Sequence, residues 1–162
     1  MRAELKSPEK DGAIARNFLS AFAAESFFVY LSFRTEADTS EIVRALCAQG
    51  KKVCAPRLVG REMIAAPYTE ALVFNGYGIR EPATGGDEPC EIVVAPLLAA
   101  DREGYRLGYG GGYYDRYFSA HPNALRVGLC YEGQLTDRLP RGRFDLPLHK
   151  IVTERGVYAY RD

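Results

Sequence analysis

The sequence has few of the residues from which structural metal sites and disulfide frameworks are built. Its 162 residues include four cysteines, and no two of these are in C-x-x-C spacing. The two histidines, His121 and His149, do not lie beside a pair of cysteines. Structural zinc sites need four such ligands held close together. The composition therefore argues against a zinc site, and we expect the cysteines to be buried, reduced thiols.

Long apolar runs and an excess of charge of either sign are also missing. No run approaches the roughly 20 residues that cross a bilayer, and the first ten residues are too polar for a signal peptide. We therefore expect a cytoplasmic protein. The formal net charge is zero, which argues against a broad electrostatic grip on nucleic acid or anionic membrane. The length and the 47% of hydrophobic residues predict one domain, residues 1–162, with a single core.

The most informative stretch is a glycine-rich segment, residues 106–116, with the sequence Arg-Leu-Gly-Tyr-Gly-Gly-Gly-Tyr-Tyr-Asp-Arg. Glycine costs conformational entropy on folding, so a run of it indicates positive φ angles or a ligand close to backbone N–H groups. No Gly or Pro follows from Tyr113 to Phe118, which predicts a helix at about 112–120. Backbone amides at a helix N-terminus form an anion site. Arg106 and Asp115 flank the loop and suit phosphate oxygens and Mg²⁺, respectively.

This segment matches neither of the two common phosphate-binding patterns. No G-x-x-x-x-G-K-[ST] occurs in the sequence, and counting G-x-G-x-x-G from Gly108 places the last glycine at Tyr113. The residues alone therefore indicate a phosphate cradle of an uncommon type. A surface loop of low complexity is the alternative interpretation.

The rest of the chain predicts an α/β fold. Ser7-Pro8-Glu9 is a helix start, and the helix runs to about residue 24. Residues 26–33 form a continuous apolar run typical of a buried parallel strand. A helix that stops at Gly50 and a strand at 51–56 follow. Residues 26–56 are therefore a βαβ unit, whose crossover should be right-handed.

Further segments complete the predicted fold, a single-domain three-layer sandwich with a mostly parallel central sheet flanked by helices, Rossmann-like in type. In such sheets ligands bind beyond the carboxyl ends of strands, which places Glu36 at the expected mouth. A helix cap or a solvated loop acid is the alternative role for Glu36. The remaining predictions are strands at 91–98 and 125–131, short strands around 61–72 and within 151–160, a hairpin turn at 101–105, and loops at 75–86 and 137–145.

Several blocks of the sequence resemble, in the same order, the motifs of the 5-formyltetrahydrofolate cyclo-ligase family, also called methenyltetrahydrofolate synthetase. The resemblance covers nearly the whole chain and includes the glycine segment. The blocks are residues 30–36 with Thr39, residues 51–57 with Met63, residues 78–82, residues 94–96 with Asp101 and Gly104, residues 106–116, and residues 144–154.

The resemblance implies an ATP- and Mg²⁺-dependent ligase of one-carbon folate metabolism. It would convert 5-formyltetrahydrofolate to 5,10-methenyltetrahydrofolate, with release of ADP and phosphate, through a phosphorylated formyl intermediate of iminophosphate type. Positioning and charge neutralisation would be the protein's tasks. The implied partners are the small molecules 5-formyltetrahydrofolate and ATP. We expect a monomer without a nucleic-acid or membrane partner.

The resemblance also assigns site residues. Asp115 and Asp145 would hold magnesium, and Arg106, Tyr113 and Asp115 would be catalytic. The implied ATP-binding residues are Arg2, Arg106, Leu107, Gly108, Tyr109, Gly110, Gly111, Gly112, Tyr113 and Tyr114. The implied substrate-binding residues are Leu31, Glu36, Tyr77, Tyr109, Gly110, Gly111, Gly112 and Tyr113.

Some of these residues have simpler roles as alternatives. Asp115 can merely favour the first turn of a helix, Asp145 can be an ordinary loop acid, and Tyr77 can be a loop aromatic rather than a pterin-stacking ring. Members of the family usually begin with a Lys and then Leu-Arg four residues on. Here Met1-Arg2 is similar to the Leu-Arg, so Arg2, alone or with Lys6, is left to reach ATP phosphates. A solvated basic face is the alternative role for Arg2 and Lys6.

Two functions of other classes remain open from the sequence. One is a folate- or nucleotide-binding regulatory module without turnover, which the absence of the N-terminal Lys favours. The other is a single-strand nucleic-acid binder that uses the Gly/Tyr/Arg segment as a stacking platform. Zero net charge and scattered basic residues argue against the second.

Overall fold

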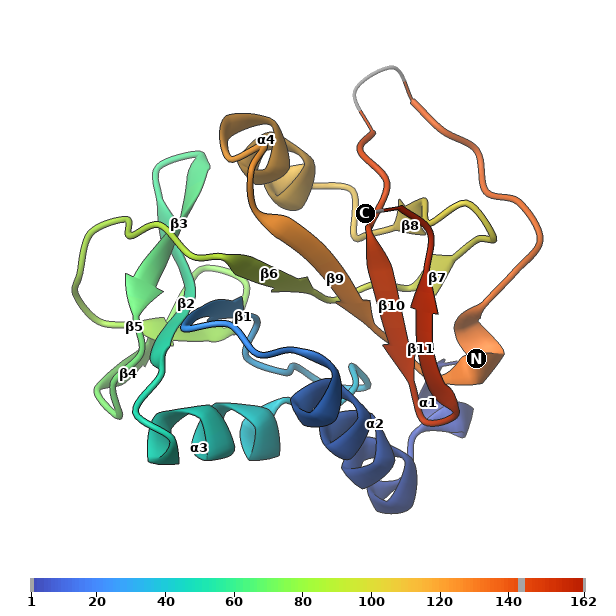
Figure 1. Cartoon of the computed structure of the whole chain (residues 1–162). Helices are drawn as coiled ribbons and strands as arrows, with labels where there is room; N and C mark the ends of the chain where they lie inside the picture. Colours follow the sequence, from blue (N-terminus) through green and yellow to red (C-terminus); the bar gives the residue numbers. More distant parts are fainter. Residues whose placement is uncertain (1, 143–144, 162) are drawn as a thin grey trace.

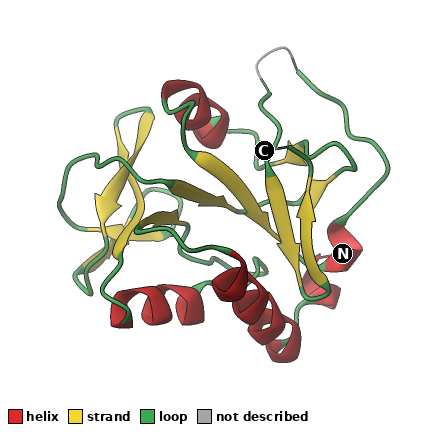
Figure 2. Cartoon of the chain, viewed as in Figure 1, coloured by secondary structure: helices red, strands yellow, loops and turns green. Residues whose placement is uncertain are grey.

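A seven-stranded sheet forms the centre of the protein (Figure 2). The computed structural model describes residues 2–142 and 145–161. The strand order is β11-β10-β9-β6-β1-β2-β3, in which the five inner strands are parallel and both edge strands are antiparallel. The strands of this sheet are β1 (Ser26–Val29), β2 (Lys52–Val59), β3 (Glu62–Pro67), β6 (Ile92–Ala95), β9 (Leu125–Leu129), β10 (Lys150–Thr153) and β11 (Gly156–Ala159).

Helices cover both faces of this sheet, which confirms the three-layer α/β prediction. Helices α2 (Pro8–Ala21) and α3 (Ser40–Ala48) lie on one face, and α4 (Tyr113–Ala120) lies on the other (Figure 1). Val93 and Val94 are neighbours in β6 and are both fully buried. Val94 packs in the cluster under α2 and α3, and Val93 packs in the cluster under α4. A parallel strand buried on both faces accounts for the apolar runs of the sequence.

The order of the parallel strands locates the point where a ligand is expected. Numbered along the chain, the five parallel strands lie in the order 2-1-3-4-5, which is the flavodoxin-like variant of the doubly wound fold. The connections change direction between β1 and β6, which are hydrogen-bonded neighbours. Ligands of such sheets bind beyond the carboxyl ends of the strands at this switch point. The segments that follow Val29 and Ala95 therefore form the expected binding edge.

The first part of the chain follows the sequence prediction closely. The Ser7 hydroxyl accepts a hydrogen bond from the Lys10 N–H at 3.1 Å, and Pro8 occupies the first turn of α2. The helix ends at Ala21, three residues earlier than expected. A short helix, α1 (Arg2–Leu5), precedes it. Strands β1 and β2 are parallel neighbours joined through α3, so the predicted βαβ unit is confirmed.

Strand β1 is shorter than the apolar run that predicted it. The run extends to Phe33, but the strand ends at Val29. The Thr39 hydroxyl donates to the Tyr30 carbonyl at 2.7 Å and accepts from the Ser32 N–H at 3.2 Å. The Tyr30 N–H still donates to the Val94 carbonyl of β6 at 3.4 Å, but beyond it the Thr39 bonds take the place of ladder hydrogen bonds, and Arg34 then takes a positive φ of 54°. A side chain that follows in the sequence thus turns the backbone away from the sheet and into the loop that carries Glu36.

Two further predictions needed correction. Residues 75–86 were expected to be loop, but they contain β5 (Arg80–Pro82), which pairs antiparallel with β4 (Leu72–Phe74). The cysteines were expected to be buried, but Cys47 is exposed and Cys90 is half-buried. Cys54 and Cys130 are buried as predicted.

The predicted hairpin turn at 101–105 is confirmed. It joins β7 (Ala99–Ala100) to β8 (Arg106–Leu107), which pair antiparallel. Asp101 is fully buried, and its carboxylate accepts from the N–H groups of Glu103 at 2.9 Å, Tyr105 at 3.1 Å and Leu139 at 3.0 Å. It also pairs with Arg141. Asp101 thus fixes the hairpin that delivers Arg106 to the glycine segment.

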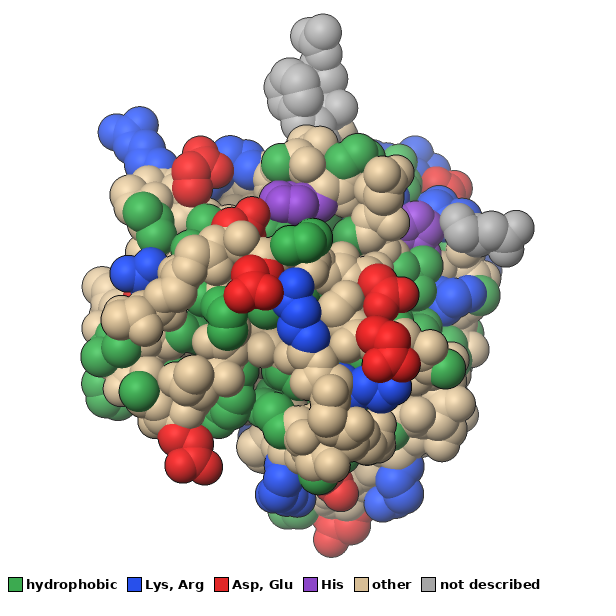
Figure 3. Space-filling model, turned by 60° about the vertical axis from the view of Figure 1, so that its left-hand side comes forward, with side chains coloured by type: hydrophobic (Ala, Val, Ile, Leu, Met, Phe, Trp, Pro, Cys, Tyr) green, Lys and Arg blue, Asp and Glu red, His purple; other side chains and the backbone are tan. Residues whose placement is uncertain are grey.

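The outer surface agrees with the zero net charge of the sequence. On the face shown in Figure 3, acidic and basic side chains are interspersed. None of the helices in the described part of the chain is long and apolar enough to span a membrane. A 3-10 turn, η1 (Glu132–Gln134), completes the regular structure between β9 and β10.

Candidate functional site

The glycine segment forms the loop between β8 and α4, as the sequence predicted. Gly110 and Gly112 have φ angles of 94° and 71°, a region that residues with a Cβ atom rarely adopt. Gly112 directly precedes α4, and a Cβ atom there would lie 2.9 Å from Nη1 of Arg116. The first N–H groups of a helix have no acceptor within the helix. The loop therefore presents the N-terminus of α4 as an anion site.

Three side-chain contacts anchor this loop to other parts of the molecule. The Tyr109 hydroxyl donates to Glu36 Oε2 at 3.0 Å. The hydroxyls of Tyr113 and Tyr77 are 3.1 Å apart, and their rings meet edge to face. Arg116 donates to the Gly111 carbonyl at 2.9 Å and to the Arg61 carbonyl at 3.1 Å. The structure thus joins four of the predicted substrate-site residues in two pairs, Tyr109 with Glu36 and Tyr113 with Tyr77.

Glu36 lies in the loop after β1, at the switch point of the sheet. Its side chain is only 6% exposed. Oε1 accepts from the Phe33 N–H at 2.7 Å, while Oε2 faces Tyr109. One carboxylate therefore closes its own loop and also holds the glycine loop. A fixed, mostly buried carboxylate of this kind is suited to accept hydrogen bonds from a ligand's N–H groups.

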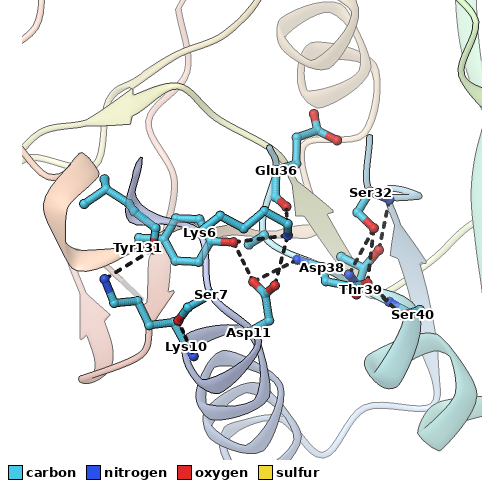
Figure 4. Close-up of polar contacts among 12 residues, drawn as sticks. Lys6, Ser7, Lys10, Asp11, Ser32, Glu36, Asp38, Thr39, Ser40 and Tyr131 are labelled. Atoms are coloured by element: carbon cyan, nitrogen blue, oxygen red, sulfur yellow. Dashed lines mark hydrogen bonds and ion pairs between the residues drawn. The ribbon is translucent and has the colours of Figure 1, made fainter. Parts of the chain in front are cut away.

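A polar network supports the Glu36 loop from behind (Figure 4). The Lys6 ammonium donates to the Glu36 carbonyl at 2.9 Å, to Asp11 Oδ2 at 2.9 Å and to the Tyr131 hydroxyl at 3.3 Å. Asp11 Oδ1 accepts from Tyr131 at 2.6 Å and from the Asp38 N–H at 3.2 Å. Lys6, whose side chain is 32% exposed, therefore supports the Glu36 loop through these contacts. That Lys6 would also reach ATP phosphates stays a prediction.

Arg106 places a cation under the glycine loop. Its Nη1 lies 3.4 Å from the Pro96 carbonyl oxygen, and its guanidinium carbon lies 5.1 Å from the centre of the Tyr114 ring. The Nε atom is buried and has no hydrogen-bond partner among the described residues. Burial lowers the pKa of Arg106, while the charge of Asp115 opposes that shift. A buried guanidinium with an unused donor is equipped to bind an anion.

Asp115 and Asp145 are near enough for the charge of one to affect the other, and their role as magnesium ligands stays a prediction. Burial raises the pKa of Asp115; the Asp145 charge adds to this rise, and Arg106 opposes it. Asp145 accepts a hydrogen bond from the Gly142 N–H and so closes its own turn. Two neighbouring carboxylates provide the hard oxygen ligands that suit Mg²⁺, which is commonly held by one or two carboxylates plus substrate phosphates. The described residues contain no group of three or more His, Cys, Asp or Glu that could hold a metal by itself.

Other predicted residues of the segment have structural contacts that explain their types. Tyr114 packs on Phe28 and Phe118, with ring centres 6.5 Å and 6.1 Å away, and burial raises its pKa. Leu107 is exposed. A Cβ at Gly108 would lie 2.7 Å from Arg106 Nη1, so glycine leaves room for the arginine. Tyr114 therefore packs mainly in the core, and its ring lies against the guanidinium of Arg106.

Leu31 borders a cavity of about 360 Å³ beside the segment that follows β1. Tyr68 and Val43 give this cavity an apolar wall, while Arg44, Glu70 and Arg80 bring charge to it. The Arg2 backbone belongs to α1, but its side chain is outside the described residues, as is Phe144. Their predicted roles are not addressed by the structure.

Sequence reasoning missed the residues that hold the site together. Arg116 was noted only as the end of the glycine segment, yet it joins that segment to the β2–β3 turn. Asp11 and Tyr131 were not singled out, although both contact Lys6. A single Tyr or Asp carries no sequence signal of such a role. The network becomes visible only in the folded chain, where Tyr131 bonds to Asp11, 120 residues earlier.

The fold and the site together define a class of protein. A doubly wound α/β sheet, with a glycine loop before a helix N-terminus, a buried arginine and two carboxylates, is typical of an enzyme that acts on phosphorylated ligands. The model of the 5-formyltetrahydrofolate cyclo-ligase family matches residues 11–154. The chain belongs to this family of ligases.

Individual relatives agree with this assignment. The chain is 32% identical over 149 residues to the 5-formyltetrahydrofolate cyclo-ligase of Escherichia coli K12, with 85% of this chain and 82% of the relative covered. It is 31% identical over 157 residues to the Haemophilus influenzae enzyme of the same name, with 85% and 80% covered.

Solved structures confirm the fold. The NMR structure of Aquifex aeolicus 5,10-methenyltetrahydrofolate synthetase matches with a TM-score of 0.84 and 29% identity, over 99% of this chain and 88% of that one. A Mycoplasma pneumoniae 5,10-methenyltetrahydrofolate synthetase matches with a TM-score of 0.74 over 94% and 96%. That chain is 20% identical, so it supports the fold alone.

Proposed function

We propose that this chain catalyses the reaction after which its family is named, the ATP-dependent ring closure of 5-formyltetrahydrofolate to 5,10-methenyltetrahydrofolate. The observation that carries the proposal is the 3.0 Å hydrogen bond between Tyr109 and Glu36. It joins the loop suited to phosphate to the acid suited to a pterin, at the switch point of the sheet. An enzyme that phosphorylates one ligand with another needs both sites within one contact distance.

ATP binds at the glycine loop in this proposal. The N–H groups at the start of α4 and of residues 108–112 face the phosphates, and the helix dipole favours their negative charge. Arg106 adds a buried positive charge below the loop. Its unused Nε–H is one donor available to a phosphate oxygen or to the phosphorylated formyl group.

The folate lies between Glu36 and the tyrosines of the glycine loop. Glu36 accepts hydrogen bonds from pterin N–H groups, and Tyr77, which is 60% exposed, offers a ring for stacking. The cavity beside Leu31 leaves room for the part of the substrate that extends away from the pterin. Arg44 and Arg80 at its border suit the carboxylates of the glutamate tail.

The chemistry needs activation of a poor leaving group. The formyl oxygen attacks the γ-phosphorus of ATP, the bond to ADP breaks, and an iminium-type phosphate ester forms. N10 then attacks the formyl carbon and gives up its proton to the departing phosphate, the carbon–oxygen bond breaks, and phosphate leaves. Arg106 and the loop amides neutralise the charge on the transferring group, and the loop excludes water from it. Tyr113 borders the same space and can donate a hydrogen bond to the formyl or phosphate oxygen.

Asp115 and Asp145 hold magnesium in this proposal. The raised pKa of Asp115 arises from burial and from the neighbouring Asp145 charge, so the pair carries negative charge that a cation relieves. Bound there with the nucleotide, the metal ion would neutralise phosphate charge. The other magnesium ligands would then be phosphate oxygens and water.

The test follows product formation. Protein is mixed with 5-formyltetrahydrofolate and Mg-ATP, and the near-ultraviolet absorbance of the conjugated methenyl product is recorded. An ATP-dependent rise that is lost in Asp115→Ala supports the enzyme and the metal role together. Folded protein that binds both ligands without a rise in absorbance identifies a binding module instead.

A further inference from the structure

A side chain of α4 holds one backbone carbonyl of the glycine loop. Nη1 of Arg116 donates to the Gly111 carbonyl at 2.9 Å, and Nη2 donates to the Arg61 carbonyl at 3.1 Å. The two terminal nitrogens of one guanidinium thus bond to the glycine loop and to the turn between β2 and β3. Because a guanidinium is a rigid, planar fork, it fixes its two acceptors relative to one another. Arg116 therefore fixes the Gly111 carbonyl relative to the sheet.

The position of this carbonyl determines where the next amide points. None of the peptide bonds in the described part of the chain is cis, and a planar trans peptide directs its C=O and its N–H to opposite sides. Since the Gly111 carbonyl points to Arg116, the Gly112 N–H points away from Arg116. Gly112 directly precedes α4, so this N–H adds to the free N–H groups at the start of the helix.

A glycine-rich loop needs such a restraint. With no Cβ on Gly111 or Gly112, the peptide between them can also adopt the reversed orientation, which would present a carbonyl oxygen where the N–H now lies. Gly110 and Gly112 have positive φ angles, whereas the φ of Gly111 between them is not positive. Successive N–H groups can be turned to one side in this way, as in the backbone nests that bind anions.

Tyr113 adds to the same restraint. The guanidinium carbon of Arg116 lies 5.0 Å from the centre of the Tyr113 ring, which is within the range of a cation–π contact. A Cβ atom at Gly111 would lie 3.0 Å from two carbons of that ring. The ring therefore lies against Gly111, and Arg116 holds both the carbonyl and the ring beside it.

We propose that Arg116 is the positioning residue of the phosphate-binding loop. It holds the peptide between Gly111 and Gly112 in the orientation that turns the Gly112 N–H toward the phosphates of ATP. This role rests on the proposed function, because it requires that the glycine loop binds the nucleotide. Arg116 does not itself touch the phosphates, since its terminal nitrogens are bonded to backbone carbonyls. Arg106, whose Nε has no partner among the described residues, is the cation that does.

The test is calorimetric titration of the full chain with Mg-AMP-PNP, a non-hydrolysable analogue of ATP, and with inorganic tripolyphosphate, which offers phosphates alone. Arg116→Met removes both carbonyl bonds. We expect Kd for both ligands to rise about tenfold, the effect of one lost hydrogen bond to a charged group. The Kd for 5-formyltetrahydrofolate, measured without nucleotide, should stay that of wild type. A general loss of structure would instead weaken all three ligands.

Two further variants separate positioning from charge and from packing. Arg116→Lys keeps the positive charge, but an ammonium lacks the planar fork that holds two carbonyls. Its affinity for AMP-PNP should lie between those of wild type and Arg116→Met. Arg161→Met is the matched control, because Arg161 also bonds to two backbone carbonyls, those of Leu148 at 2.6 Å and Glu103 at 2.9 Å. It should leave nucleotide affinity unchanged.

Amide NMR of the isotope-labelled wild-type chain follows the peptide directly. Saturating tripolyphosphate should move the Gly112 amide proton downfield, as expected for an N–H that donates to an anion. An unmoved Gly112 amide in a chain that binds tripolyphosphate overturns the role of Arg116, and this result does not depend on the folding of a variant.

Wild-type affinity for AMP-PNP in Arg116→Met also overturns this role, and wild-type affinity in Arg116→Lys shows that charge alone is sufficient and overturns it too. Each of these results leaves the proposed function intact. A wild-type chain that binds neither AMP-PNP nor tripolyphosphate refutes the nucleotide site itself, and the role of Arg116 with it.

Discussion

Tyr109 reaches from the glycine loop to Glu36, 73 residues earlier in the chain, and donates its hydroxyl to the carboxylate at 3.0 Å. The tyrosine is 58% exposed and Glu36 is 6% exposed, so the bond forms where the binding edge opens to solvent. Through this contact, a change in the position of the glycine loop would alter the position of the Glu36 carboxylate, and the reverse.

Tyr109→Phe tests that contact with the ring retained. We expect KM for 5-formyltetrahydrofolate to rise about 5- to 10-fold, because one hydrogen bond to a charged group contributes on the order of 1–2 kcal/mol. Steady-state kinetics with saturating ATP measures it. Tyr158→Phe is the control, since that hydroxyl also donates to a glutamate, Glu132, but at the distant β11 edge. Equal kinetics for Tyr109→Phe and wild type would show that this hydrogen bond does not contribute to substrate binding.

Asp115→Asn should separate stability from function. The folded-state pKa of Asp115 is raised, first by burial, so the charged form lowers stability once pH exceeds the unfolded-state pKa. That penalty is complete above the folded-state pKa and disappears at acidic pH. The neutral variant should therefore unfold at a higher temperature than wild type at pH 7 but not under strongly acidic conditions, while ATP-dependent turnover is lost. A lower unfolding temperature at pH 7 would contradict this prediction.

Lys6→Met should weaken the support behind Glu36. It removes donors to the Glu36 carbonyl, Asp11 and Tyr131, at a cost of about 1–3 kcal/mol in the free energy of unfolding. We expect KM for the folate to rise more than kcat falls, with partial rescue by Lys6→Arg. Lys51→Met, whose partner Glu25 is exposed, is the matched control. Loss of stability with unchanged KM would show that the network supports only the fold.

Asp101→Ala should destabilise the β7–β8 hairpin. Three backbone N–H groups and Arg141 lose their acceptor, so we expect a loss of about 2–4 kcal/mol by chemical denaturation. Asp137→Ala, which breaks an exposed pair with Arg102, should change stability by less than about 0.5 kcal/mol.

The same aspartate should give a pH signature. Burial acts to raise the pKa of Asp101, but hydrogen bonds from Leu139, Glu103 and Arg141 outweigh it and lower the pKa. A lowered folded-state pKa means that the stabilisation is present above the unfolded-state value of about 3.9 and is lost as pH falls through the folded-state value. The difference in unfolding free energy between wild type and Asp101→Ala should therefore shrink below about pH 4. A difference that stays constant down to strongly acidic pH would rule out this role.

Gly112→Ala should disturb the start of α4. The residue has a φ of 71°, and the added Cβ would lie 2.9 Å from Arg116 Nη1, which predicts a cost of roughly 1–2 kcal/mol. Because Arg116 must move, the anchor to Arg61 is lost and the affinity for ATP should fall. Gly76→Ala is the control, since a Cβ there meets open space and its φ is not positive. Nucleotide titration by calorimetry compares the two variants.

The parts of this fold that could be predicted are those in which a few neighbouring residues determine the local structure. Ser7-Pro8 marks a helix start by its own chemistry, and Gly112 marks a positive φ because other residues avoid it. Strand β5 was not predictable, because Arg80–Pro82 has neither apolar alternation nor β-branched residues and is a strand only by pairing with β4. The end of β1 could not be predicted either, because it depends on Thr39, which lies beyond the apolar run and bonds to the Tyr30 carbonyl.

The candidate site also has parts that the sequence predicts and parts that it does not. Arg106, Asp115 and the glycines lie in one segment, so their chemistry could be inferred together. Lys6 was expected to face a ligand on the family resemblance. One of its partners, Asp11, is only five residues away, but Glu36 and Tyr131 are 30 and 125 residues away, and only the folded chain brings these two to its ammonium group.

The three anchors of the glycine loop also determine when its entropy is lost. Tyr109, Tyr113 and Arg116 each join the loop to a different part of the chain through contacts made within the protein itself. The cost of ordering a glycine-rich segment therefore falls on folding, and ligand binding need not supply it. A loop already in place binds by docking, so its amides can meet a phosphate at the first productive encounter.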